Sequence, residues 1–418
     1  MSSLQQCAQK IIKPYDAVQG SDSLRGIICE RVRSGCVSSL GPQLEAIVLT
    51  GSMARDEASF IRREDAWELL GDTEFMLVFK KNATPPPETL NTIRRRIEKD
   101  LQNCKVQCAI DLTAVCPSYF RRLPPHIFTY ELKHHGQVIW GNGPILRLIP
   151  DFPINDLSLE DAWRLLCNRM IEQLAFIEDL SNMTVELTPR LHYATVKLYL
   201  DMATSYLVFA RAYEATYRGR AESLRRLADR AAPDGNTPFP LKAFSERVIT
   251  CTEWKLSGAD ASFQSGQGFW REAIGFARGL WRWEVIEMTG AVGDLSTGAL
   301  CDRLARQLKL TQKIRGWASA GRRGGGLKTW RHWPRWAWLG TRATPRYLVY
   351  RAGTELVFHL PSLVENAEKP PSLDPDWANM ASLLPIATPG SVASRTDWQV
   401  LAEKVLMNYR RFVSSTRA

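Results

Sequence analysis

Two hydrophobic patterns occupy different parts of this chain. Within the first 150 residues, compact apolar runs at 46–50, 74–79 and 106–115 have the length and β-branched content of buried strands. Helical spacing at 24–39 and 88–102 places helices between them. From Asp156 onward, apolar residues recur mainly at helical intervals. These patterns predict an α+β protein with a small mixed sheet in its N-terminal part and a mainly helical remainder.

The later segments divide further. Helical spacing predicts helices at 159–177, 188–217, 238–255 and 269–288. A β-hairpin is predicted at 346–359, with Ala352-Gly353 as its turn, followed by irregular chain at 369–390 and a helix at 396–412. We therefore expect three domains, at 1–150, 151–300 and 301–418.

The positive charge of the chain is concentrated in one segment. The formal net charge is +10, and residues 301–360 hold 13 Lys or Arg but only two Asp or Glu. Such a local excess indicates an anionic partner. Within 319–345, basic and indole side chains alternate; they are Arg322, Arg323, Lys328, Arg331 and Arg335 with Trp330, Trp333, Trp336 and Trp338. Single-stranded RNA, an anionic membrane surface, and packing of the tryptophans in a core all fit this composition.

Composition also limits the cellular setting. The first ten residues lack the pattern of a secretory signal, and no run of about 18 apolar residues predicts a membrane span. The nine cysteines show no C-x-x-C pair, so neither a zinc site nor a disulfide framework is indicated. We expect a reduced, cytoplasmic protein.

Three acidic residues lie on the predicted strands. Asp72 and Glu74 have i, i+2 spacing, which directs both side chains to the same face of a strand. Asp111 lies within the apolar run 106–115, where an unpaired carboxylate is costly. If the two strands are neighbours, three carboxylates converge and repel one another unless cations neutralise them. An all-oxygen site of this kind suits Mg²⁺.

A Gly51-Ser52 dipeptide follows the first predicted strand. Glycine at the end of a buried strand lets the backbone approach a phosphate closely, and the start of a following helix favours an anion. The Ser52 hydroxyl adds a donor. We expect this turn to bind phosphate.

These motifs together resemble the DNA polymerase β-like nucleotidyltransferase superfamily. Its pattern is a strand, a Gly-Ser turn, a D-x-[DE] pair on the next strand and a third carboxylate on a later strand. Gly51-Ser52, Asp72 with Glu74, and Asp111 match it in order. Residues 131–141 are similar to a segment that follows the catalytic domain in small-molecule and antibiotic adenylyltransferases. The gap of 21 residues from Gly51 to Asp72 is longer than usual, which marks 60–70 as an insertion, and Glu74 stands where Asp is commoner.

The resemblance implies a catalytic domain at 1–150 with Asp72, Glu74 and Asp111 as catalytic metal ligands. It implies two Mg²⁺ ions, a nucleoside triphosphate donor with ATP favoured, and release of pyrophosphate. Several members present a lysine from the helical domain to the triphosphate, and Lys197 matches that position; the alternative is an i, i+4 ion pair with Asp201.

The function that we expect is transfer of a nucleotidyl group to an acceptor hydroxyl on a small molecule or RNA. The alternative is an inactive protein of the same fold that binds nucleotide or RNA as a regulatory module. Near the turn, Arg55 is interpreted either as a phosphate contact or as a surface residue, and Asp56-Glu57 as a solvated helix start.

Overall fold

The chain forms two compact units, which are described separately. The computed structural model describes residues 19–63, 65–80, 84–181, 187–230, 237–257, 266–323, 333–365, 375–386 and 397–413. Unit 1 comprises Met1–Ser158, Arg211–Ser223 and Ile249–Phe263. Unit 2 comprises Leu159–Ala210, Leu224–Val248 and Gln264–Ala418. Most of the predicted helical domain therefore falls in unit 2 with the basic C-terminal region, whereas residues 151–158, Arg211–Ser223 and Ile249–Phe263 belong to unit 1.

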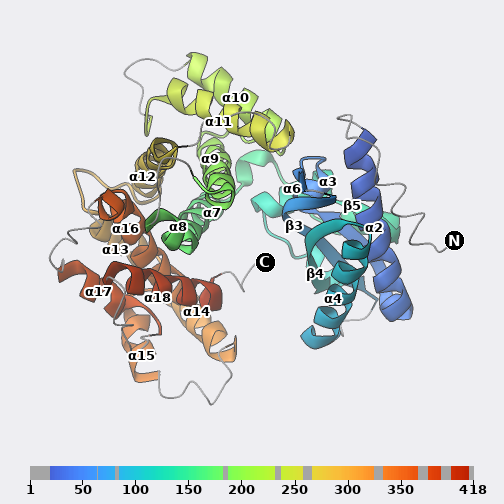
Figure 1. Ribbon diagram of the computed structural model, residues 1–418. Helices are drawn as coiled ribbons and strands as arrows, with labels where there is room; N and C mark the ends of the chain where they lie inside the picture. Colours follow the sequence, from blue (N-terminus) through green and yellow to red (C-terminus); the bar gives the residue numbers. More distant parts are fainter. Residues whose placement is uncertain are drawn as a thin grey trace. The chain divides into compact units, whose positions relative to one another are not determined.

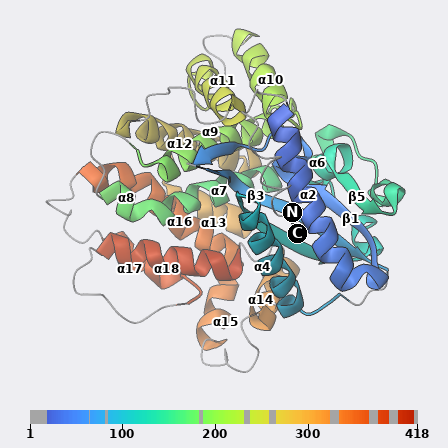
Figure 2. The ribbon, with the colours of Figure 1, turned by 45° about the vertical axis from the view of Figure 1, so that its right-hand side comes forward.

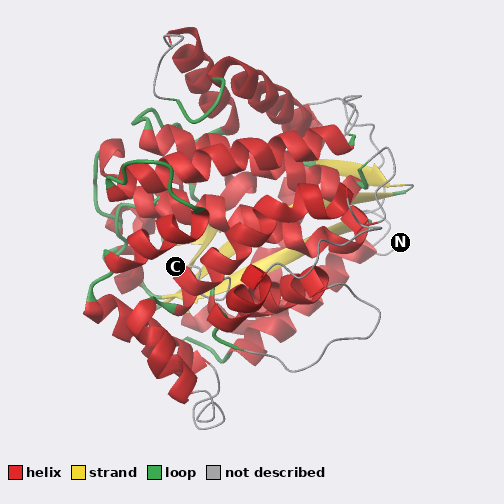
Figure 3. Ribbon diagram, turned by 90° about the vertical axis from the view of Figure 1, so that its left-hand side faces the viewer, coloured by secondary structure: helices red, strands yellow, loops and turns green. Residues whose placement is uncertain are grey.

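Unit 1 contains every strand of the described chain (Figures 1 and 3). Its strands are β1 (Leu44–Thr50), β2 (Phe60–Arg63), β3 (Ala66–Phe79), β4 (Val106–Val115) and β5 (Gln137–Gly141). Its helices are α2 (Gln19–Leu40), α3 (Gly51–Ala54), α4 (Pro87–Asn103), α5 (Pro117–Phe120) and α6 (Ile127–His135), with 3-10 turns η1 (Gly41–Gln43), η2 (Gly143–Leu148) and η3 (Ile154–Asp156). The start of α10 (Tyr217–Arg230) and the end of α11 (Leu241–Ser257) complete it.

One long strand, β3, organises the sheet. The first half of β3 pairs with β2 and its second half pairs with β1, both antiparallel. Strand β4 runs parallel to β3, and β5 adds to the free side of β1. The sheet is therefore mixed, as expected from sequence.

Helices cover one face of this sheet, and shorter elements cover the other. Phe75 and Leu77 of β3 pack with apolar residues of α2 and α4, which lie across the strands in Figure 2. Met76 and Val78 point to the opposite face, where they pack with residues of α5, α6 and η2 such as Leu132. This alternation fixes which face each residue of β3 occupies.

The secondary-structure elements described in unit 2 are all helices, joined by loops (Figure 3). Its further elements are α7 (Leu159–Glu172), η4 (Gln173–Phe176), α8 (Ile177–Ser181), α9 (Pro189–Phe209), α12 (Gln267–Thr289), α13 (Thr297–Arg306), α14 (Leu310–Arg323), α15 (Trp333–Arg342), α16 (Pro345–Glu365), α17 (Pro375–Leu383) and α18 (Asp397–Phe412). The Thr188 hydroxyl caps α9 by accepting from Leu191 N, with Pro189 in the first turn. No described helix is both long enough and apolar enough to cross a membrane.

Several elements differ from the sequence-based prediction. The predicted insertion at 60–70 forms β2 and the first part of β3, so it extends the sheet. The predicted helix 188–217 ends at Phe209, and α10 begins at Tyr217. The stretch 369–390 contains α17, while 369–374 and 387–390 lie outside the described residues.

The predicted hairpin at 346–359 is wrong, because these residues lie within helix α16. This helix is buried on most sides, which removes the polar stripe that reveals a helix in sequence. Gly353 is no turn: a Cβ there would lie 2.5 Å from Ile171 Cγ1, so glycine permits close packing of α16 on α7.

The core of unit 2 encloses a carboxyl group. Glu284 of α12 is fully buried, and its Oε1 accepts a hydrogen bond from Ser205 Oγ of α9 at 2.5 Å. Burial raises the pKa of Glu284 from 4.5 to about 8, although the hydrogen bond from Ser205 acts in the opposite direction. Glu284 is therefore protonated in the folded chain at neutral pH.

We predict that Gly141→Ala destabilises unit 1 by at least about 2 kcal/mol, because it adds backbone strain and a steric clash. Gly141 has φ +89°, and a Cβ would lie 2.2 Å from the Glu45 carbonyl oxygen. Gly143 has nothing within 4 Å of its Cβ position. Gly143→Ala is therefore the control, and urea unfolding measures both. Equal stability of the two variants would contradict this account of the close approach.

A second prediction concerns pH. The folded chain keeps the Glu284 proton up to about pH 8, whereas the unfolded chain loses it near 4.5. The stabilisation is complete below pH 4.5 and is lost as the pH rises to about 8. Relative to Glu284→Gln, the wild type should thus lose up to about 1.4 kcal/mol of unfolding free energy per pH unit in this window.

Urea unfolding at several pH values from 5 to 8 measures this difference. Glu287→Gln, at an exposed position of the same helix, serves as the control and should show no such slope. A pH-independent difference between wild type and Glu284→Gln would show that Glu284 is ionised in the fold.

Candidate functional site

The Gly51 turn lies directly against a carboxylate of the neighbouring strand. Gly51 follows β1 with φ +71°, and a Cβ there would lie 2.8 Å from Glu74 Oε2. Both the backbone angle and the space therefore require glycine. The Ser52 carbonyl closes the turn by accepting from Arg55 N at 3.2 Å and Glu57 N at 2.9 Å. Helix α3 is only four residues long, so little helix dipole is available to an anion at this turn.

Strand register brings the predicted acidic residues to one end of the sheet. Glu74 pairs with Thr50 of β1 on one side and with Asp111 of β4 on the other. Asp72 lies two residues before Glu74, on the same face. These residues share the face of Met76, opposite the helices α2 and α4. Asp72 and Asp111 are exposed and Glu74 is half-buried, so this end of the sheet is open to a ligand.

The donor atoms suit a hard cation, but the described residues do not form a closed metal cage. No group of three or more His, Cys, Asp or Glu side chains that could hold a metal ion is found among them. Mg²⁺ commonly takes one or two carboxylates, with water and substrate phosphates completing its shell. The carboxylates of Asp72, Glu74 and Asp111 provide oxygen ligands of this type. Their role as metal ligands stays a prediction.

The predicted triphosphate lysine belongs to α9 in unit 2. Lys197 Nζ lies 5.8 Å from the centre of the Tyr193 ring. Asp201, the alternative partner, accepts from Arg169 Nε at 2.6 Å. The assignment of Lys197 to nucleotide binding stays a prediction.

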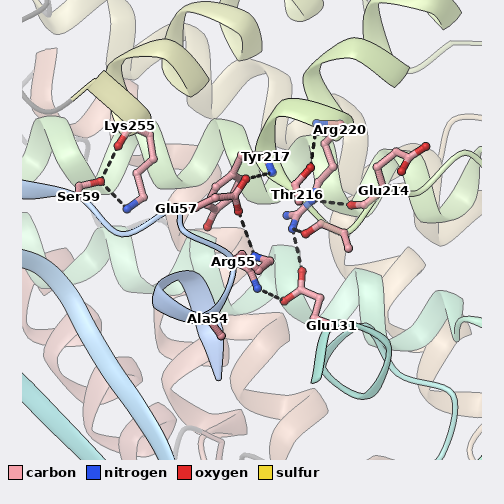
Figure 4. Close-up of polar contacts among 12 residues, drawn as sticks. Ala54, Arg55, Glu57, Ser59, Glu131, Glu214, Thr216, Tyr217, Arg220 and Lys255 are labelled. Atoms are coloured by element: carbon pink, nitrogen blue, oxygen red, sulfur yellow. Dashed lines mark hydrogen bonds and ion pairs between the residues drawn. The ribbon is translucent and has the colours of Figure 1, made fainter. Parts of the chain in front are cut away.

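A buried network of charged side chains follows the Gly-Ser turn (Figure 4). Arg55 donates to Glu57 at 3.0 Å and to Glu131 of α6 at 2.5 Å. The other oxygen of Glu131 accepts from Arg220 Nη2 and from the Tyr213 hydroxyl, each at 2.7 Å. Two arginines therefore balance two glutamates, and the network joins the turn to α6 and to the segment Arg211–Ser223.

Backbone and ring contacts complete this network. Glu57 Oε1 accepts from Tyr217 N at 2.5 Å, and Arg220 donates to the carbonyls of Glu214 and Ala215. The Arg220 guanidinium also lies 4.8 Å from the Tyr217 ring centre, a cation–π distance. Most hydrogen-bonding groups of the cluster thus have partners, as burial requires.

Burial and ion pairing have opposite effects on the pKa values of Arg55 and Arg220. Removal from water would lower the pKa of Arg55, but Glu131, Tyr217 and Glu57 outweigh it and raise the pKa. The pKa of Arg220 is raised in the same way, against burial, by Tyr213 and Glu131. Both guanidinium groups are therefore charged at every accessible pH.

These contacts correct the interpretation of the residues after the turn. Arg55 is no surface residue, since 6% of its side chain is exposed and both of its ion pairs are intramolecular. Glu57 is buried as well, so it does not begin a solvated helix. Only Asp56 is exposed, where it pairs with Arg25. The pairing of Glu131 with Arg55, and the place of Arg220 in the same network, have no signal in the sequence, because these residues lie 76 and 165 residues beyond Arg55.

The basic, tryptophan-rich segment is divided between core and surface. Trp336 is buried and donates from Nε1 to the Pro385 carbonyl, while Arg335 donates to the carbonyls of Ser382 and Leu384. Trp333 and Trp338 are 63% and 46% exposed. Lys328, Trp330 and Arg331 lie outside the described residues. Core packing is thus confirmed for Trp336, and an RNA partner stays a prediction.

No protein family, curated protein or solved structure matches this chain. The interpretation of the site therefore depends on its own residues and geometry.

We predict that Glu131→Gln destabilises unit 1 by about 3 kcal/mol, because it leaves two buried arginines with one carboxylate. Glu30→Gln is the matched control, since Glu30 pairs with Arg33 at the surface and its loss should cost less than about 0.5 kcal/mol. Urea unfolding monitored by circular dichroism measures both variants. Similar values for the two would mean that the buried network contributes no more than a surface ion pair.

Proposed function

We propose that this protein is a Mg²⁺-dependent nucleotidyltransferase, which moves a nucleotidyl group from a nucleoside triphosphate to an acceptor hydroxyl. One observation carries the proposal: Glu74 is in register with both Thr50 and Asp111, and its carboxylate lies beside Gly51. The arrangement places the backbone of the Gly51 turn next to acidic side chains on the two adjoining strands β3 and β4. ATP is the proposed donor, and a small molecule or RNA is the proposed acceptor.

Each part of the site has a separate task in this reaction. The Gly51-Ser52 turn binds the donor phosphates through its backbone and the Ser52 hydroxyl. Asp72 and Glu74 hold Mg²⁺, which when bound neutralises phosphate charge and orients the donor. Asp111, on the neighbouring strand, also contributes to metal binding and takes the proton of the acceptor hydroxyl. Lys197 is the proposed side chain for additional contact with the triphosphate.

The proposed reaction is an in-line substitution at the α-phosphorus of the donor. The acceptor oxygen forms a bond to the α-phosphorus while the bond from that phosphorus to the α,β-bridging oxygen breaks. The bond electrons leave with pyrophosphate, and the acceptor proton passes to the Asp111 carboxylate. Positioning and charge neutralisation contribute most of the rate enhancement, since this chemistry needs no covalent enzyme intermediate.

The proposal predicts Mg²⁺-dependent transfer of label from an α-³²P-labelled nucleoside triphosphate. The full chain is incubated with each of the four labelled donors and with small-molecule, RNA and protein fractions of a cell extract. Pyrophosphate release should accompany labelling of one fraction. Asp111→Asn and Asp72→Asn should each reduce the rate at least about 100-fold, as loss of electrostatic stabilisation commonly does.

Asp65→Asn is the matched control. Asp65 precedes β3 at an exposed position and pairs with Lys105, so its loss should leave the rate unchanged. Transfer that survives Asp111→Asn would remove Asp111 from the reaction. Binding of a non-hydrolysable ATP analogue without turnover in any fraction would replace the enzyme with a nucleotide-binding module.

A further inference from the structure

Unit 2 contains a cavity of about 520 Å³ that the proposed reaction does not use. Its lining comes from α7, α12, α13 and α16, with further residues from α14, α15 and α17. Its volume falls within the range of about 300–1,000 Å³ that small-molecule sites occupy. The cavity is therefore large enough for a ligand of metabolite size.

The floor of the cavity is aromatic. Trp163, Trp281 and Tyr350 line it and are each at most 2% exposed. The Tyr350 hydroxyl donates to Asn168 Oδ1 at 2.8 Å, so this hydroxyl already has a partner within the protein. Trp163 meets Tyr350 edge to face, with ring centres 5.3 Å apart. These side chains give the inner wall of the cavity an apolar composition, which favours an apolar or aromatic body over a charged one.

The rim of the cavity is cationic. Arg306 and Arg342 line it and are exposed, and Lys313 beside them is half-buried. Lys313 Nζ donates to the Thr341 carbonyl at 3.1 Å, and Arg342 stacks on Trp338 at 3.9 Å. Among the described residues, none of these three cations has an ion pair with a carboxylate.

The one acidic residue of the lining does not offset these cations. Asp302 accepts an ion pair from Arg351, which also lies 3.6 Å from Glu355. Arg351 is thus shared by two carboxylates, and these three groups together leave one net negative charge beside the three rim cations. With Arg306, Lys313 and Arg342 included, the wall keeps a net positive charge, which attracts an anion and disfavours a cation.

We propose that this cavity binds a small organic anion with an aromatic or apolar body. The carboxylate or phosphate group of the ligand lies at the rim near Arg306 and Lys313. The body of the ligand lies in the inner part of the cavity, near Trp163 and Trp281. The site lies within unit 2 and is independent of the proposed nucleotidyl transfer, so either proposal can fail without the other.

The test uses the full chain with four defined probes in isothermal titration calorimetry. 1-Naphthoate and phenyl phosphate represent the two anionic groups, 1-naphthalenemethanol is the neutral analogue, and inorganic phosphate lacks the apolar body. We expect one saturable site for at least one aromatic anion. The neutral analogue and inorganic phosphate should each bind at least about tenfold more weakly, because each lacks one of the two recognition elements.

Paired variants locate the site. Arg306→Gln and Lys313→Gln should each weaken binding of the aromatic anion about 3- to 10-fold, as expected for loss of one partly exposed charge contact. Arg303→Gln and Arg315→Gln remove the same charge from the same helices outside the lining, and should change affinity less than about twofold. Ala305→Phe, at a half-buried lining position, should block the cavity.

Circular dichroism and thermal unfolding confirm that each variant is folded. Absence of saturable binding by both aromatic anions would overturn the proposal. So would equal affinity for the neutral analogue, or equal losses in the lining variants and their controls. Full binding by a folded Ala305→Phe variant would place the ligand elsewhere.

Discussion

The buried ion pairs of Arg55 with Glu57 and Glu131 constrain how distant segments of unit 1 are held together. Burying four charged groups is costly, and the cost is recovered only if every partner is in place. Here Glu131 serves both Arg55 and Arg220, and the network joins segments that are more than 150 residues apart. Because Arg55 directly follows the Gly-Ser turn, the same contacts that hold the segment Arg211–Ser223 also fix the position of that turn.

Local signals in the sequence predicted much of unit 1. The run 106–115 is β4 to the residue, because it is compact, apolar and ended by Pro117. Strand β5 was not predicted, since its residues Gln137–Gly141 are half-buried or exposed and show no clear alternation. In unit 2 the prediction failed at α16, where burial on most sides removed the helical pattern. In both β5 and α16, the secondary structure is determined by the surroundings in the folded chain rather than by the propensities of the residues.

The candidate site was predictable to the extent that it depends on single strands. The i, i+2 spacing of Asp72 and Glu74 correctly placed both on one face, but only strand pairing shows that Asp111 is opposite Glu74. The buried network was not predictable, because ion pairs between distant segments leave no periodic trace. Arg55 illustrates the limit: its position near the turn was evident, whereas its two carboxylate partners are set by tertiary structure.

The fourteen-residue strand β3 is the strand with which most of the other strands of the sheet pair. Three other strands pair directly with it; β2 pairs in regular register, whereas the register shifts between Leu44 and Ala46 of β1 and, against β4, between Glu68 and Asp72 of β3. Insertion of one residue between Asp72 and Phe75 would turn Asp72 and the residues before it in β3 to the opposite face if the second half of β3 kept its pairing, since side chains alternate between faces. Length variation is therefore not tolerable in the second half of β3. The same few residues of β3 therefore determine both the strand pairing of the sheet and the positions of the acidic side chains Asp72 and Glu74.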